Sequence, residues 1–478
     1  MTEKLLNEIS VFGKRCASTP PNDCANVAKN SLPCNLLRKN KPELPEISEP
    51  ELIRHFTRLS KLNYSLAANF YPLGSCTMKY NPIINEKITA LDAFTNLHPL
   101  QSQETTQGTL EALFGLQNAL CEISGMDAFT LQPSAGANGE FTGLLIARAY
   151  FKSIGQKRTK IIVPDSAHGT NPASAALAGF EIVSIHSEPD GHIDPGKLKL
   201  ILNSDVACLM FTVPNTLGVF EKEILEICSM AHENGSLLYY DGANLNALMG
   251  MVRPADLGFD IMHINLHKTF STPHGGGGPG AGPVGVKKHL KEFLPIPIIS
   301  KNNSGYYLDY SATKTIGMLR SFYGNIPVLL KAYTYILALG CDGIKKSCQQ
   351  AVINANYLLA LLKNVLPTPA GNRCLHEFVL SGKPLKEFGI RTIDIAKRLL
   401  DYGYYAPTIY FPLIVEEAIM IEPTETESKQ TLDEFADTLK KVLVEARQNS
   451  KLLKTAPLTT PVSRLNEVEA ARKPILKY

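Results

Sequence analysis

The middle of the chain alternates between apolar residues at helical spacing and short runs typical of strands. Residues 139–153 place apolar groups on one side of a helix, and residues 159–165 form a β-branched strand. Further strand candidates are residues 180–188, 205–214, 236–244 and 260–265, and the helix candidates between them are residues 172–179, 195–203 and 224–235. This alternation predicts an α/β fold with a mainly parallel sheet covered on both faces, in which ligands gather beyond the carboxyl ends of the strands.

The pattern changes toward both ends of the chain. Residues 16–50 are rich in Pro among polar residues, which predicts an extended arm, either a linker or a strap laid across a partner. Beyond residue 330 the alternation weakens into apolar helical stretches around 328–363 and a smaller mixed segment. We therefore predict an arm with a following helix (1–60), a large α/β domain (61–330) and a small C-terminal α+β domain with a terminal extension (331–478).

The segment that begins at residue 424 predicts an amphipathic helix. Thr424 and Glu427 have the spacing of a helix-capping box, and we interpret the neighbouring carboxylates as capping groups rather than catalytic ones. The apolar face of this helix would comprise Leu432, Phe435, Ala436, Leu439, Val442 and Leu443.

Composition narrows the class of protein. A chain of 478 residues with 44% hydrophobic and 19% charged residues can bury more than one core. Its net charge of +3, from 48 basic and 45 acidic residues, argues against a protein built to neutralise nucleic acid. The ten cysteines lack close zinc-type pairs, so we expect a reducing compartment and no metal site. The amino terminus has no secretory or transit signal, and no apolar run approaches the roughly 20 residues of a membrane span, so we expect a cytoplasmic protein.

The most informative chemistry lies in residues 264–286. Lys268 follows a predicted strand, and six glycines occur from Gly275 to Gly282, where they permit close backbone approach to a ligand. Alone, the lysine would be a surface charge and the glycines a loop. Together they favour a nucleophilic lysine. Its ordinary pKa of about 10.4 has to be lowered by desolvation or by nearby positive charge before the amine can react near neutral pH. Pyridoxal phosphate uses such a lysine.

Two further segments supply what that cofactor needs. Asp241 ends a hydrophobic strand before Lys268 and is suited to hold the protonated pyridine nitrogen, although an Asx turn would explain it in isolation. Ser134, Ala135 and Gly136 enter the first predicted helix, whose N–H groups can hold a phosphate.

His168 and Asn215 also follow predicted strands. His168 could stack its imidazole on the cofactor ring, and Asn215 could donate a hydrogen bond to the phenolic oxygen. A satisfied core histidine and a turn asparagine are the alternatives, and the shared location at strand ends favours the functional interpretation.

These residues together resemble the pyridoxal-phosphate enzymes of the aspartate aminotransferase fold, and more closely the P-protein family of the glycine cleavage system. The resemblance runs from about residue 60 to the carboxyl end and rests on many blocks in family order. They include NYSLAANFYPLGSCTMKYNP, HPLQSQETTQGTLEAL, QPSAGANGE, DSAHGTNPASA, YYDGANLNA, NLHKTFSTPHGGGGPG, YFPLIVEEAIMIEPTETESK and APLTTPVSRLNEVEAARKP.

The resemblance implies a seven-stranded, mainly parallel sheet with pyridoxal 5′-phosphate as cofactor. It makes Lys268 the aldimine lysine, Asp241 the pyridinium partner and His168 the stacking residue. We also expect Ala243 and His267, in the same two motifs, to contact the cofactor. Single-chain members are about twice as long, so this chain resembles subunit 2 of the two-subunit bacterial type, whose active site lies at the junction of the two halves.

The implied reaction is the decarboxylation of glycine. The remaining aminomethyl group passes to the lipoyl arm of the glycine cleavage H-protein, and carbon dioxide is released. The implied partners are that H-protein and a homologous subunit 1, in an α2β2 heterotetramer. The alternatives are another pyridoxal-phosphate decarboxylase or transaminase, and a noncatalytic scaffold subunit with a residual cofactor pocket.

The resemblance also suggests residues near the substrate entrance, although their Pro and Gly context could equally describe turns. They are Asn69, Ser75, Thr77 and His98. Cys76 could be redox-sensitive beside a disulfide substrate, but a buried, inert thiol is the more usual state. Arg320 could bind the glycine carboxylate or form an interface ion pair.

Overall fold

A computed structural model describes residues 3–18, 23, 32–40, 42–98, 100–321 and 323–476. Its contacts divide the chain into two units, Met1–Ser65 with Thr455–Tyr478, and Leu66–Lys454. The first unit contains α1 (Glu49–Lys61), which begins at a capping box between Ser48 and Glu51, and α14 (Glu467–Arg472). Within the predicted arm, residues 19–22, 24–31 and 41 lie outside the described residues. The domain boundary at residue 330 stays a prediction.

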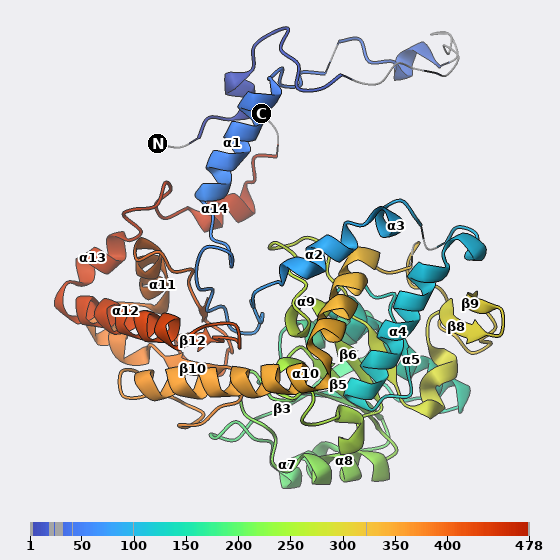
Figure 1. Cartoon of the computed structure of the whole chain (residues 1–478). Helices are drawn as coiled ribbons and strands as arrows, with labels where there is room; N and C mark the ends of the chain where they lie inside the picture. The colour runs from blue at the N-terminus through green and yellow to red at the C-terminus, as the bar shows by residue number, and fades with distance from the viewer. Residues whose placement is uncertain are drawn as a thin grey trace. The chain divides into compact units, whose positions relative to one another are not determined.

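The second unit is built on a seven-stranded sheet in the order β1-β7-β6-β5-β4-β2-β3 (Figure 1). The strands are β1 (Ala128–Thr130), β2 (Lys160–Pro164), β3 (Glu181–Ile185), β4 (Val206–Thr212), β5 (Leu237–Gly242), β6 (Ile261–Ile264) and β7 (Val284–Val286). β7 is antiparallel to both neighbours, and the pairs β2–β3, β2–β4, β4–β5 and β5–β6 are parallel. The predicted mainly parallel sheet is therefore confirmed.

The central strands of the sheet are buried on both faces, and most of their residues are apolar. All seven residues of β4 are buried, and successive side chains enter different cores: Leu209 packs on one face and Met210 on the other. The first face carries α4 (Gln107–Ser124), α7 (Pro195–Ile201) and α8 (Ile224–Glu233). The second face carries α5 (Gly136–Ser153) and α6 (Thr170–Leu177).

A smaller sheet in the order β10-β12-β11 lies beside the carboxyl end of the long helix α10 (Ile326–Leu362; Figure 1). Its strands, β10 (Phe378–Ser381), β11 (Thr408–Ile409) and β12 (Ala418–Ile421), are antiparallel and pack with α11 (Thr392–Asp401) and α12 (Lys429–Gln448). α10 (Ile326–Leu362) is interrupted at Gly340, where φ is 62°. The remaining elements are α2 (Ile83–Thr89), α3 (Asp92–Thr95), α9 (Leu266–Thr269), α13 (Ser450–Thr455), β8 (Ile298–Asn302) and β9 (Gly305–Asp309).

The amphipathic helix predicted near the carboxyl end is α12, and its six predicted apolar residues are all buried. Its predicted start is wrong. Ser428 is the N-cap and accepts a hydrogen bond from the Thr431 N–H at 3.1 Å, whereas Thr424 precedes the helix in irregular backbone with φ of 62°. The interpretation of the nearby carboxylates as capping groups therefore fails. Among the described residues, no helix combines the length and apolar character needed to cross a membrane.

Candidate active site

A cavity of about 240 Å³ lies where β4, β5 and β6 end. The parallel strands bring together side chains that are far apart in the sequence, as the alternating pattern predicted. The residues predicted to bind the cofactor that line it are Ala135, Gly136, His168, Asp241, Ala243, His267 and Lys268. Ser134 and Asn215 are absent from this lining.

Lys268 reaches the cavity from α9, a single helical turn that follows β6. Its backbone N–H donates to the carbonyl of Asn265 at 3.0 Å, which turns the chain directly after the strand. The side chain is half-buried and lines the cavity, so a ligand there can reach the amine. A lysine in this position can act as a nucleophile toward a carbonyl group.

Hydrogen bonds from neighbouring residues hold the Asp241 carboxylate in place. Its Oδ2 accepts hydrogen bonds from the Asn171 amide at 3.0 Å and the Thr212 hydroxyl at 3.1 Å, and its Oδ1 accepts one from the Ala243 N–H at 2.9 Å. Burial alone would raise the pKa of Asp241, but His263, the Asn171 amide and Lys268 outweigh it and hold the pKa below its ordinary value. The cavity therefore has a carboxylate on one side and an amine on another.

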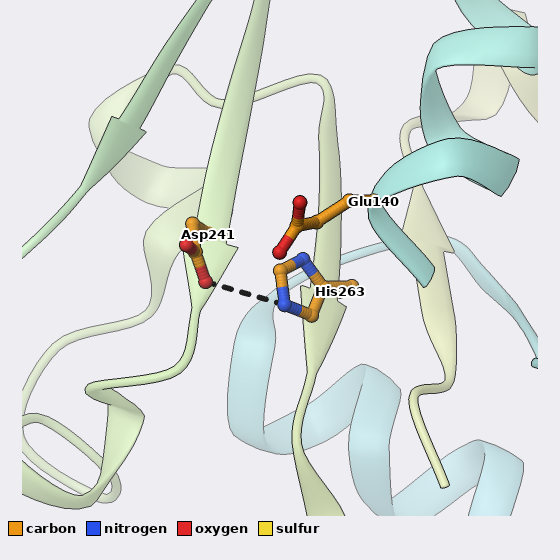
Figure 2. Close-up of side chains that lie close together, drawn as sticks. All are labelled: Glu140, Asp241 and His263. Atoms are coloured by element: carbon orange, nitrogen blue, oxygen red, sulfur yellow. Dashed lines mark ion pairs between the residues drawn. The ribbon is translucent and has the colours of Figure 1, made fainter. Parts of the chain in front are cut away.

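Two further buried groups accompany Asp241. Figure 2 shows Glu140 from α5, Asp241 at the end of β5 and His263 from β6 pointing toward one another. The His263 Nε2 lies 3.2 Å from the Asp241 Oδ1, and the His263 Nδ1 lies 3.0 Å from the Tyr239 hydroxyl. Glu140 accepts hydrogen bonds from the hydroxyls of Thr170 and Ser174, both at 2.8 Å.

The amino end of α5 forms a third wall of the cavity. Ala135 is the N-cap, its side chain offers no cap, and the first N–H groups of the helix have no partner within it. Gly282 packs against this end so closely that a Cβ there would collide with the Ala135 carbonyl and the Gly136 nitrogen. The backbone N–H of Ser134 instead donates to the Asn138 side chain at 3.0 Å. The free N–H groups and the helix dipole suit this wall to an anion.

His168 lies exposed at the side of the cavity. Its Nδ1 lies 2.9 Å from the Thr170 hydroxyl oxygen and 3.2 Å from the Thr170 backbone nitrogen. Loss of water around the ring and the charge of Lys268 lower the pKa of His168, which favours the neutral ring. An uncharged, flat ring is suited to stacking.

Several predicted residues are used elsewhere. The Asn215 amide donates to the Gly191 carbonyl at 2.7 Å, and its oxygen accepts from the N–H groups of Leu217 and Val219, so its carboxamide stabilises a turn. Asn215 therefore has a local structural role, and its contact with a cofactor oxygen stays a prediction. Among the entrance residues only Ser75 lines the cavity; Asn69 is exposed, Thr77 is buried behind it, and His98 lines a different cavity. Arg320 lies outside this lining and donates to Asn325 at 3.3 Å.

The donors and acceptors of this site fit pyridoxal phosphate. Asn265 Oδ1 and His267 Nδ1 are buried and, among the described residues, have no hydrogen-bond partner, which leaves polar atoms for a ligand. Burial, Lys268 and His274 lower the pKa of His267 to about 3, so its ring is neutral. An amine, a carboxylate and a free helix end around one cavity match the aldehyde, ring nitrogen and phosphate of the cofactor.

The sequence reasoning missed other members of the lining, namely Ala137, Glu140, Thr170, Thr212, Thr216, Asn244 and Asn265. Asn265 and Thr212 stand at strand ends, so the rule that found Asp241 could have found them. Glu140 lies within the apolar run of α5 and gave no such signal; only its polar character inside that run marks it.

Comparisons with known proteins agree on one family. Residues 21–306 match the family model described as glycine cleavage system P-protein, and residues 347–458 match the one described as glycine dehydrogenase, C-terminal domain. The probable glycine dehydrogenase (decarboxylating) subunit 2 of Endomicrobium trichonymphae is 62% identical over 477 residues, covering 100% of this chain and 99% of the relative. The corresponding protein of Thermotoga maritima is 57% identical over 473 residues, covering 98% and 99%. The name subunit 2 in these relatives implies a partner subunit.

Solved structures share the fold. An inhibitor-bound glycine decarboxylase (P-protein) of the glycine cleavage system aligns with a TM-score of 0.74 and 22% identity, over 86% of this chain and 94% of that chain. A sphingosine-1-phosphate lyase from Burkholderia pseudomallei aligns with a TM-score of 0.62 and 15% identity, over 87% and 94%. The likenesses confirm the predicted fold class.

Proposed function

Because the chain belongs to the glycine cleavage system P-protein family, we propose that it is the lysine-bearing subunit of a two-subunit glycine decarboxylase, glycine dehydrogenase (aminomethyl-transferring). The observation that carries the proposal is the placement of Lys268, Asp241 and the amino end of α5 around one cavity. Each group alone has an ordinary structural explanation, but their convergence supports a pyridoxal-phosphate site.

In this proposal the residues of the chain hold the cofactor at three points. Lys268 binds it covalently through its amine, and Asp241 keeps a proton at the ring nitrogen. Ala135 and Gly136 surround the phosphate at the amino end of α5, while the neutral ring of His168 stacks on the cofactor. When bound, pyridoxal phosphate withdraws electrons from the substrate carbon that loses its carboxylate.

The proposed partners follow from the family. The reaction consumes glycine and the oxidised lipoyl disulfide of H-protein; one sulfur takes the aminomethyl group, the other becomes a thiol, and carbon dioxide leaves. A homologous subunit 1 completes the active site in an α2β2 heterotetramer, and we propose that the complex works in the cytoplasm. The solvent-facing side of the Lys268 cavity is the natural approach for the lipoyl arm.

The test is co-expression with the homologous subunit, followed by an assay of label exchange between carbon dioxide and the carboxyl group of glycine. We expect exchange that requires the partner subunit and lipoylated H-protein. Lys268→Ala should abolish it, whereas Lys288→Ala, an exposed lysine close in sequence, should not. Borohydride reduction and peptide mapping should place the cofactor at residue 268.

Exchange activity retained by Lys268→Ala, or label mapped to another lysine, would overturn the assignment. Cofactor binding without glycine exchange, in the presence of both partners, would favour another decarboxylase, a transaminase or a noncatalytic scaffold.

A further inference from the structure

Three titratable side chains lie fully buried close to Lys268, and the proposed function leaves them without a role. His376, Glu377 and Glu422 each place a ligand-type atom within 4.8 Å of the other two, and all three are 0% exposed. The His376 Nε2 lies 3.7 Å from the Glu377 Oε1, too far for a hydrogen bond. Such a cluster is costly unless the charges are neutralised.

The register of the small sheet explains why the two carboxyls meet. β10 and β12 pair antiparallel with Phe378 opposite Ile421, so the next position places Glu377 opposite Glu422. Side chains directly opposite on one face of an antiparallel pair have Cβ atoms about 4.5–5.5 Å apart, and like charges there repel. The backbone therefore forces two acidic residues together at the end of the sheet.

Both carboxyls bind the same loop. The Ser75 N–H donates to the Glu377 Oε2 at 2.7 Å, and the Thr77 N–H donates to the Glu422 Oε2 at 2.9 Å. Ser75 and Thr77 have positive φ values of 65° and 43°, an unfavourable conformation for residues with a Cβ. The two hydrogen bonds thus hold a strained loop in place.

This loop is part of the wall around Lys268. Ser75 lines the cavity, and Asn244, which also lines it, directs its amide toward the Glu377 Oε1 at 3.4 Å. The acidic pair therefore lies directly behind two residues that face the ligand space. A change in the charge of the pair would alter the electrostatic potential in that space, because buried charges are weakly screened over a short distance.

The surroundings favour protons on the pair. Burial and the neighbouring Glu422 raise the pKa of Glu377 well above its ordinary value, and burial raises the pKa of Glu422 to about 7. Lys268 lowers both pKa values, whereas Glu425, which is paired with Lys79 at 2.8 Å, raises that of Glu422.

Apart from Lys268, the titratable neighbours named here among the described residues carry no positive charge that could offset the pair. Burial lowers the pKa of His376 to about 3, so its ring is neutral. Cys76 and Cys374 are thiols whose pKa values are raised, first by burial and then by Glu377 among other groups. No described residue donates to the Glu422 Oε1, and a proton on that carboxyl would remove its uncompensated charge.

We propose that Glu377 and Glu422 are positioning residues that keep protons at the end of the β10–β12 pair. They hold the Ser75–Thr77 loop against the Lys268 cavity, and they keep this wall free of negative charge while a carboxylate substrate binds. The substrate part rests on the proposed function, because glycine carries the carboxylate. The protonation part depends only on this chain. Loss of a proton from the pair in alkaline solution would add negative charge behind Ser75 and Asn244 and weaken glycine binding.

The first test needs no substrate. Infrared difference spectra of the full chain, recorded from acidic to alkaline pH, should contain the C=O band of a buried protonated carboxyl that disappears as the pH rises. Glu377→Gln and Glu422→Gln should each change this band, whereas Glu416→Gln, at an exposed glutamate of the small sheet region, should not. A wild-type spectrum without the band, or a band unchanged in both variants, would overturn the proposal, as would a bound metal ion lost in both variants.

The second test uses the complex with its partner subunit. For wild type, KM for glycine should rise in alkaline solution by up to about tenfold per pH unit, with kcat changing less, because one required proton is lost. Glu422→Gln cannot ionise and should flatten this profile. An identical KM profile in wild type and Glu422→Gln would overturn the substrate part. If wild type has no glycine activity, the proposed function fails, and the infrared result still decides whether the pair holds protons.

Discussion

Replacing Lys79 by Met should destabilise the protein strongly, although Lys79 does not line the Lys268 cavity. The Lys79 side chain is 1% exposed, and its Nζ donates to Glu425 at 2.8 Å, Asn246 at 2.9 Å and Tyr335 at 3.1 Å. Methionine fills similar volume but leaves the Glu425 carboxylate buried without its cation. Glu425 then retains only neutral donors such as the Ser347 hydroxyl at 2.6 Å.

The expected cost follows from that loss. Removing one partner of a buried ion pair costs about 3–5 kcal/mol, and the remaining donors to Glu425 favour the lower end, about 3 kcal/mol. For a cooperative unit the size of Leu66–Lys454, that corresponds to a fall in Tm of about 4 °C. Denaturant unfolding of Lys79→Met, Glu425→Gln and the double variant would measure the coupling.

The double variant should recover at least about 1 kcal/mol relative to the sum of the single variants, because neither charge is left alone. Lys429→Met, which breaks an exposed pair with Asp433, should leave Tm unchanged and serves as the control. The reasoning would be refuted if the double variant lost as much unfolding free energy as the two single variants together, or if Lys79→Met were as stable as wild type.

Three further predictions test the cofactor site and the acidic pair. Asp241→Asn should retain cofactor but reduce glycine exchange by about 10²–10⁴-fold, because the amide cannot hold the ring proton as a carboxylate does. The exchange rate and the amount of bound cofactor are measured on the same preparation. Gly282→Ala should weaken cofactor binding in a spectroscopic titration by displacing the amino end of α5, whereas Gly108→Ala, with open space around its Cβ, should not. The pKa of Glu422 is raised from 4.5 to about 7, so the folded state holds an extra proton between these pH values. The stability of the wild type should therefore fall by about 3 kcal/mol as the pH rises across this window. Urea unfolding at several pH values should show this slope for wild type and not for Glu422→Gln.

The sequence predicted those parts of the site that depend on local pattern and on the geometry of parallel sheets. Asp241 and His168 were found because the carboxyl ends of parallel strands meet at one edge, and Gly136 because a helix begins there. Asn215 obeyed the same rule, yet its carboxamide is used by its own turn. Position at a strand end therefore identifies candidates, but it does not show which of them already have local partners.

The acidic pair shows what local pattern could not reveal. The carboxylates after Ile421 were interpreted as helix caps because Thr424 and Glu427 fit a capping box, but Glu425 binds Lys79 and Glu422 binds the Thr77 N–H. These partners lie about 345 residues away in the sequence. Only the folded small sheet, by setting Glu377 opposite Glu422, gives the carboxyls their roles.

The charges around the cavity bear on which bond of glycine breaks. Within the described part of the chain, Lys268 is the single lysine or arginine among the cavity-lining residues, and lowered pKa values keep His168 and His267 neutral. A bidentate arginine would stabilise the substrate carboxylate in the ground state, and that stabilisation would have to be lost as carbon dioxide forms. A wall supported by protonated carboxyls neither anchors nor repels the carboxylate. Such a wall is suited to a carboxylate that has to leave, provided that Glu377 and Glu422 keep their protons.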